Sequence, residues 1–151
     1  MTNLDLTRNE AAAELAATEA FPQGIVVLAI EPKAILSMID EALSKLGVAV
    51  HVLPPEPLEA LQVDEEHPII FFPRVELRVR VIERVSLNEV PMHARELRDL
   101  VMSTLHGWRP SAPGVESPLL LAPKPQLKAE FPGQVIYDVI FHFASHLHPI
   151  S

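Results

Sequence analysis

The sequence predicts an α+β fold, a two-layer domain in which helices pack on one face of a mainly antiparallel, mixed sheet. The first observation is that residues 75–81 alternate between apolar and charged side chains, a period of two that is typical of a strand with one buried face. The second is that apolar side chains in residues 97–105 recur at helical spacing. The third is the order of the predicted elements: helix, strand, strand, helix, strand, strand, with an extra helix in front.

The chain is predicted to divide into an N-terminal extension (1–30) and a single α+β domain (31–151). Thr7 and Glu10 fit a capping box, in which the hydroxyl accepts an amide hydrogen bond and the carboxylate reaches back to the chain. The helix would cover residues 10–20. Its apolar stripe is mostly alanine, so we expect it to pack on the domain or on a neighbouring subunit.

The first half of the domain is predicted to contain a helix between two strand-like runs. Residues 25–30 are a short apolar run typical of a core strand. A helix then starts at Pro32 and ends at Gly47, since proline suits the first turn and glycine the position after the last. Residues 48–53 form the next strand, and residues 58–61 a single helical turn.

The second half begins with an extended segment that Pro73 interrupts, which indicates a bulge or two separate strands. The alternating strand of residues 74–83 follows. Asn88 is a suitable cap for a helix over residues 89–106, and Gly107 would end that helix.

The last part of the chain is predicted to be an antiparallel hairpin. Its strands begin at residues 119–121, continue through 126–131 and return over 135–143. Pro132 and Gly133 supply the turn between them.

Composition excludes several classes of function. The 151 residues contain no cysteine, so disulfides, thiol catalysis and thiolate metal sites are excluded. A net charge of −8 argues against nucleic-acid binding, which needs a positive surface. No apolar run approaches the roughly 18 residues of a membrane span, and the N-terminus has no secretory signal pattern.

No enzyme is predicted, and neither is any cofactor, because serine-hydrolase, dinucleotide-binding and Walker motifs are all absent. The alternative is a histidine-based metal enzyme that uses His142, His146 and His148, with Asp138 nearby. These four side chains have the same parity in a strand and would share one face. However, His142 and His146 would lie about 13 Å apart in an extended strand, so we favour a solvated strand face.

Two groups of residues are candidate subunit contacts. Trp108 and Arg109 follow the helix end, where the indole either folds back over the core or anchors a partner. Arg74, Arg78 and Arg80 form a charged strand face, which is either solvated or, at a sheet edge, matched in charge to a second subunit.

The strand of residues 75–83, the helix after it, the turn Gly107-Trp108-Arg109-Pro110 and the strand of residues 135–143 resemble the tail terminator (tail completion) proteins of long-tailed phages and prophage-like particles. The resemblance covers residues 32–143 and leaves the extension unmatched. It rests on the order of elements and on the short Gly-Trp-Arg-Pro turn.

The resemblance implies a structural virion protein that assembles as a hexameric ring. The ring would cap the tail tube, end its polymerisation and offer a docking surface for the head. The implied partners are other copies of the chain, the tail tube protein and the head–neck connector proteins. The implied location is the tail–neck junction of a virion assembled in the bacterial cytoplasm. A neck or baseplate adaptor of the same fold is the alternative.

Overall fold

The computed structural model describes residues 2–29, 32–62, 70–85 and 90–147 and confirms the α+β fold class. The helices are α1 (Asn3–Ala16), α2 (Pro32–Leu46) and α3 (Ala94–Leu105). The strands are β1 (Val27–Leu28), β2 (Val48–Val52), β3 (Glu56–Pro57), β4 (Leu61–Gln62), β5 (Ile70–Arg84), β6 (Leu120–Phe131) and β7 (Gln134–His146).

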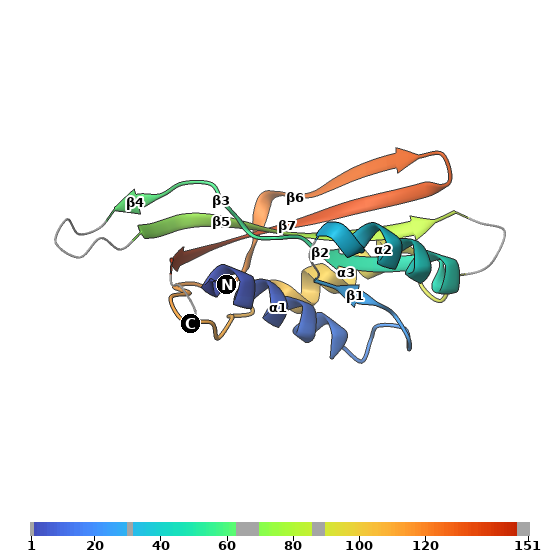
Figure 1. Ribbon diagram of the computed structural model, residues 1–151, viewed down its shortest axis with the longest axis horizontal. Helices are drawn as coiled ribbons and strands as arrows, with labels where there is room; N and C mark the ends of the chain where they lie inside the picture. Colours follow the sequence, from blue (N-terminus) through green and yellow to red (C-terminus); the bar gives the residue numbers. More distant parts are fainter. Residues whose placement is uncertain (1, 30–31, 63–69, 86–89, 148–151) are drawn as a thin grey trace.

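The strands form one mixed sheet with the order β1-β2-β5-β7-β6, and the short strands β3 and β4 also pair with β5 (Figure 1). Only β1 and β2 are parallel, and every other described pairing is antiparallel. The mainly antiparallel, mixed sheet that the sequence predicted is therefore confirmed.

The alternating segment lies in β5, at the centre of the sheet. Its apolar side chains are fully buried: Val75, Leu77, Val79 and Val81. The β5–β7 register shifts between Phe72 and Val75, so of the two arrangements predicted at Pro73, a bulge or two separate strands, the structure has the bulge. The strand continues through this bulge because Pro73 removes only the local hydrogen bonding to the neighbouring strand.

The terminal hairpin has the predicted form. β6 and β7 pair in antiparallel orientation around the turn at residues 132–133, where Gly133 adopts a φ of +79°. Their register shifts between Leu121 and Gln126, the segment that holds Pro123 and Pro125. Proline has no amide hydrogen to donate to a ladder, so the shift falls where pairing is weakest.

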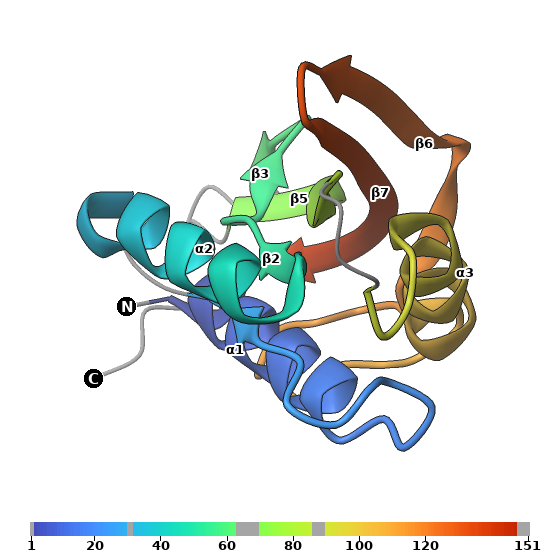
Figure 2. The same cartoon turned by 90° about the vertical axis from the view of Figure 1, so that its right-hand side faces the viewer.

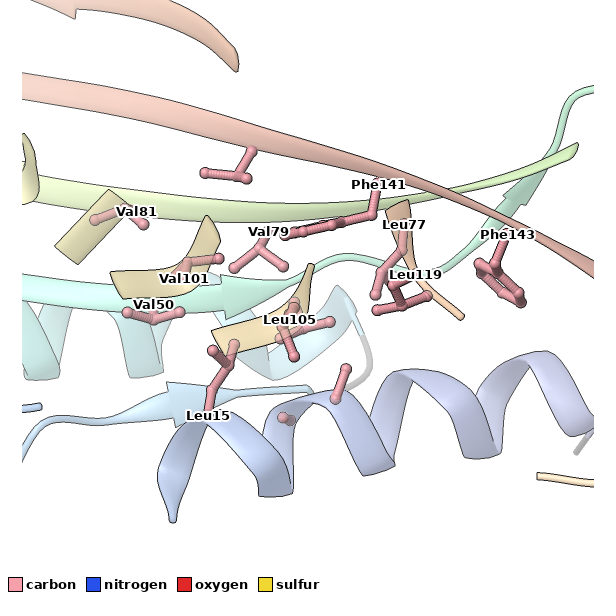
Figure 3. Close-up of a cluster of buried hydrophobic side chains, with 14 of the residues drawn as sticks. Leu15, Val50, Leu77, Val79, Val81, Val101, Leu105, Leu119, Phe141 and Phe143 are labelled. Atoms are coloured by element: carbon pink, nitrogen blue, oxygen red, sulfur yellow. The ribbon is translucent and has the colours of Figure 1, made fainter. Parts of the chain in front are cut away.

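The main core lies between the sheet and the helices α1 and α3 (Figure 3). Leu15 of α1 and Leu105 of α3 are fully buried beneath the sheet residues Val50, Val79 and Phe141. The α1 helix therefore packs on the domain, one of the two arrangements that its alanine-rich stripe predicted.

The sequence placed all helices on one face of the sheet, and α1 and α3 do share a face. The helix α2 instead lies against the opposite face, where Ala42 and Leu43 pack on Ala49 and Ile82 (Figure 2). Ala49 and Ile82 are cross-strand partners and alternate with the residues of the main core, so they expose a small apolar area on the second face.

Two helix starts and one predicted helical turn differ from the prediction. The helix α1 starts at Asn3, with Asp5 accepting a 2.7 Å hydrogen bond from the Thr2 amide. The helix α3 starts at Ala94, and the predicted cap Asn88 lies outside the described residues. The helical turn predicted at 58–61 is wrong, because β3 ends at Pro57, β4 begins at Leu61, and both strands pair with β5.

Candidate assembly surfaces

The predicted arginine face lies on the side of β5 that points away from the main core. Arg80 is the cross-strand partner of Asp138 in β7. Its Nε donates to Asp138 Oδ1 at 2.8 Å and its Nη2 to Oδ2 at 3.0 Å. This two-point contact fixes the guanidinium in the plane of the carboxylate.

Arg78 joins the same network. Its Nη2 donates to Glu76 Oε1 at 2.8 Å and its Nη1 to Asp138 Oδ2 at 3.4 Å. The hydrogen bond to Glu76 raises the pKa of Arg78, and the hydrogen bond to Asp138 raises the pKa of Arg80. We call Glu76, Arg78, Arg80 and Asp138 the arginine ladder.

The arginine ladder is balanced in charge, with two cations and two carboxylates. The Asp138 side chain is only 9% exposed, while those of Arg78 and Arg80 are about one-third exposed. A charge-matched contact with a second subunit was predicted only if this strand lay at the edge of the sheet. The strand β5 does not lie at an edge, because it is flanked by β2 and β7. The ladder therefore holds β5 to β7, and its exposed guanidinium edges are what a neighbour could contact.

Arg74 lies apart from the ladder. It pairs with Glu59 at 3.4 Å, and both side chains are about half exposed. A surface pair of this kind contributes little to stability.

His51 is a buried polar group on the same face that the sequence did not single out. It is the β2 partner of Arg80, and its Nε2 has no hydrogen-bond partner among the described residues. Burial, with the nearby charges of Arg8 and Arg80, lowers the pKa of His51 to about 4. The imidazole is therefore neutral at pH 7.

Trp108 and Arg109 lie on the α1 side of the molecule, away from the ladder. Gly107 adopts a φ of +81° and ends α3 as predicted. The half-buried Trp108 packs against the main core, and Arg109 Nη2 donates to the Val115 carbonyl at 3.3 Å. The two side chains line a shallow hollow with Glu10 and Ser111.

The histidines of β7 are not gathered around one point. His142 is the cross-strand partner of Glu76. His146 Nδ1 lies 2.8 Å from Glu116 Oε1, and the His146 ring is in tilted contact with the Phe71 ring. Burial and the charge of Arg74 lower the pKa of His142. Among the described residues no group of three His, Asp or Glu side chains could hold a metal ion, and His148 lies outside them.

A second feature that the sequence did not single out is the exposed edge strand β6. Residues 126–131 are all exposed, and the sheet order ends at this strand. The signal was present in the sequence as six residues without proline between Pro125 and Pro132. Recognising it required the strand order.

The structure thus defines an α+β protein with a curved mixed sheet, an ion-paired outer face and one long free edge. No protein-family model matches the chain, and no curated protein matches it. Two solved chains match it in fold. One of them, from a structure described as the virion of a native gene transfer agent particle, aligns with a TM-score of 0.60 over 92% of this chain and 93% of that chain at 14% identity.

At this identity the match shows a shared fold over nearly the full length of both chains. In the part of the chain that the structure describes, no helix is long and apolar enough to cross a membrane.

Proposed function

We propose that this chain is a structural protein of a phage-like virion and that it works by assembling with other copies and with other virion proteins. The observation that carries the proposal is the fold match to a chain of a gene transfer agent virion, which leaves almost no part of either chain unmatched. A match over nearly the whole of both chains shows more than a shared subdomain, and the role in a virion is inferred by analogy with that chain.

The finer proposal is a tail terminator: a hexameric ring at the tail–neck junction that caps the tail tube and offers a docking surface to head–neck connectors. Its support is the resemblance carried by the strand of residues 75–83, the Gly-Trp-Arg-Pro turn and the last strand. Such a protein needs no catalytic site and no cofactor, and it does not need to bind a membrane or a specific nucleic-acid sequence. It would assemble in the bacterial cytoplasm.

Two groups of residues are the proposed contacts between neighbouring subunits: Trp108 with Arg109, and Arg74 with the exposed edges of Arg78 and Arg80. The two groups lie on different sides of the molecule, as a head-to-tail ring requires, because each subunit of such a ring presents one surface to the left and another to the right.

The proposal is tested by absolute mass from light scattering behind size exclusion, at several concentrations. We expect a species of about six times the 16.7 kDa of one chain. A mass of 16.7 kDa at every concentration, together with no binding to purified tail tubes, would contradict it. The position of the gene distinguishes a tail terminator from a neck or baseplate adaptor, since a tail-tube gene immediately downstream supports the terminator.

A further inference from the structure

The free edge of the sheet is formed by β6. The structure places β6 at one end of the strand order, with β7 on its inner side (Figures 1 and 2). Along residues 126–131 the edge is exposed and contains no proline. Such an edge presents unpaired amide and carbonyl groups to a further strand.

The sequence of this edge, Gln-Leu-Lys-Ala-Glu-Phe, is complementary to itself in antiparallel orientation. If two copies pair with Ala129 opposite Ala129, then Lys128 of one copy lies opposite Glu130 of the other. Leu127 then lies opposite Phe131. Opposite charges and apolar pairs are the cross-strand combinations that stabilise a sheet.

The neighbouring registers are disfavoured by the same two charges. A two-fold pair centred on Lys128 places two ammonium groups opposite each other, and a pair centred on Glu130 does the same with two carboxylates. Like charges directly opposite are destabilising. Of these three registers, only the one centred on Ala129 brings opposite charges together.

The side chains that would meet are exposed and lie on the correct faces. Leu127 is 48% exposed and Phe131 57% exposed, and their β7 partners Asp138 and Gln134 place both on the outer face. Lys128 and Glu130 lie on the other face, where they form an exposed 2.8 Å ion pair within one chain. Pairing would exchange this contact for two equivalent ones between copies.

We propose that β6 pairs with β6 of a second copy of this chain in a two-fold, antiparallel contact centred on Ala129. This contact goes beyond the proposed ring. A two-fold contact joins two like surfaces and cannot repeat around a head-to-tail ring, so it joins two free chains, or two rings face to face, and leaves the ring contacts to other surfaces.

The first test reverses the charges one at a time. Lys128→Glu and Glu130→Lys each place like charges opposite one another, and we expect each to weaken self-association about tenfold in sedimentation velocity over a concentration series. Both side chains are exposed, so folding is unaffected. The double substitution Lys128→Glu/Glu130→Lys restores opposite charges and is expected to restore pairing.

A mixture of the two single variants is the most discriminating experiment, because every cross-strand charge pair between one variant and the other is attractive. We expect mixed pairs in preference to pairs of either variant alone. If Lys128 and Glu130 instead prevent the edge from pairing, no β6–β6 contact forms in the wild type. Both variants and the wild type will then have the same association state. That result overturns the proposal.

The second test is a cross-link, which the absence of native cysteine makes clean. Ala129→Cys brings two thiols face to face at about 4.5–5.5 Å between Cα atoms, within disulfide reach. Gln126→Cys is the control, since its mate would lie about 20 Å away. Oxidation is expected to link the first variant and not the second, and equal linking of the two would contradict the register.

Discussion

Asp138 and His51 are buried polar groups on the outer face of the sheet, and their placement has the clearest physical consequence. Asp138 is 9% exposed and accepts hydrogen bonds from two arginines, and the neutral His51 lies next to Arg80. Charged groups this far from water are stable only while their partners remain.

The first prediction is that the protein becomes less stable as the pH is lowered, because of His51. Burial and the neighbouring arginines lower the pKa of the folded imidazole from 6.5 to about 4. As the pH falls from 6.5 towards 4, the unfolded chain takes up a proton that the folded chain does not, so unfolding becomes easier. Urea unfolding at pH 7 and pH 5 measures this difference.

His51→Gln is expected to reduce the pH dependence, and His142→Gln, which replaces a more exposed imidazole, to reduce it less. An unchanged difference between pH 7 and pH 5 in His51→Gln would show that His51 is not the group responsible.

The second prediction concerns Asp138. Asp138→Asn leaves Arg78 and Arg80 without their shared carboxylate, and we expect it to lower the free energy of unfolding by about 1–3 kcal/mol, since both guanidinium groups keep some contact with water. Glu59→Gln breaks only the exposed pair with Arg74 and should change stability by about 0.5 kcal/mol or less. Equal effects in urea denaturation would refute the buried role of Asp138.

At the scale of elements, the long strands β5, β6 and β7 and the start of α2 at Pro32 were predictable, and the starts of α1 and α3 were not. The alternation of β5 and the Pro132-Gly133 turn are local signals, and the structure confirms both. The start of α3 depends on a distant partner, whereas α1 starts at a local cap formed by Thr2 and Asp5. Glu10, predicted to cap α1, accepts hydrogen bonds from Ser111, and the α3 amide of Ala94 donates to Glu83.

The third prediction compares two glycines that follow helices. Gly107 adopts a φ of +81°, and a side chain there would meet no other atom within 4 Å, so Gly107→Ala is expected to cost about 1 kcal/mol of backbone strain alone. Gly47 has a φ of +78°, and a Cβ there would lie 2.7 Å from Val90. Gly47→Ala should therefore cost more, about 2–3 kcal/mol.

Thermal unfolding of the two variants at one pH provides the comparison. If Gly107→Ala destabilised the protein as much as Gly47→Ala, the contact with Val90 would have no energetic role.

At the scale of the whole molecule, α1 belongs to the same core as the sheet. Leu4, Ala11 and Leu15 are buried against it, and Asn3 donates to the β7 carbonyl of His146 at 2.7 Å. The helix thus connects the start of the chain to its last strand.

The fourth prediction follows from this packing. Leu15→Ala should lower the free energy of unfolding by about 2–5 kcal/mol, because it opens a cavity beneath β2 and α3. Met38→Ala, on the exposed side of α2, should change it by about 1 kcal/mol or less. Equal and small losses would mean that residues 1–30 behave as a separable extension.

The surfaces were only partly predictable, because their partners come together through strand order. The parity of β5 placed Arg74, Arg78 and Arg80 on one face, as found. The sequence did not reveal that β5 is central, that Asp138 lies opposite Arg80, or that β6 is the free edge, since each depends on pairing between segments far apart in the chain. A pattern within one strand does not encode its neighbours.

The most direct test of the proposed function is electron microscopy of particles from a producing strain that lacks this chain. The account predicts tails of uncontrolled length without attached heads, and restoration of normal particles when the chain is supplied again. Normal numbers of particles, with tails of normal length joined to heads, would contradict it.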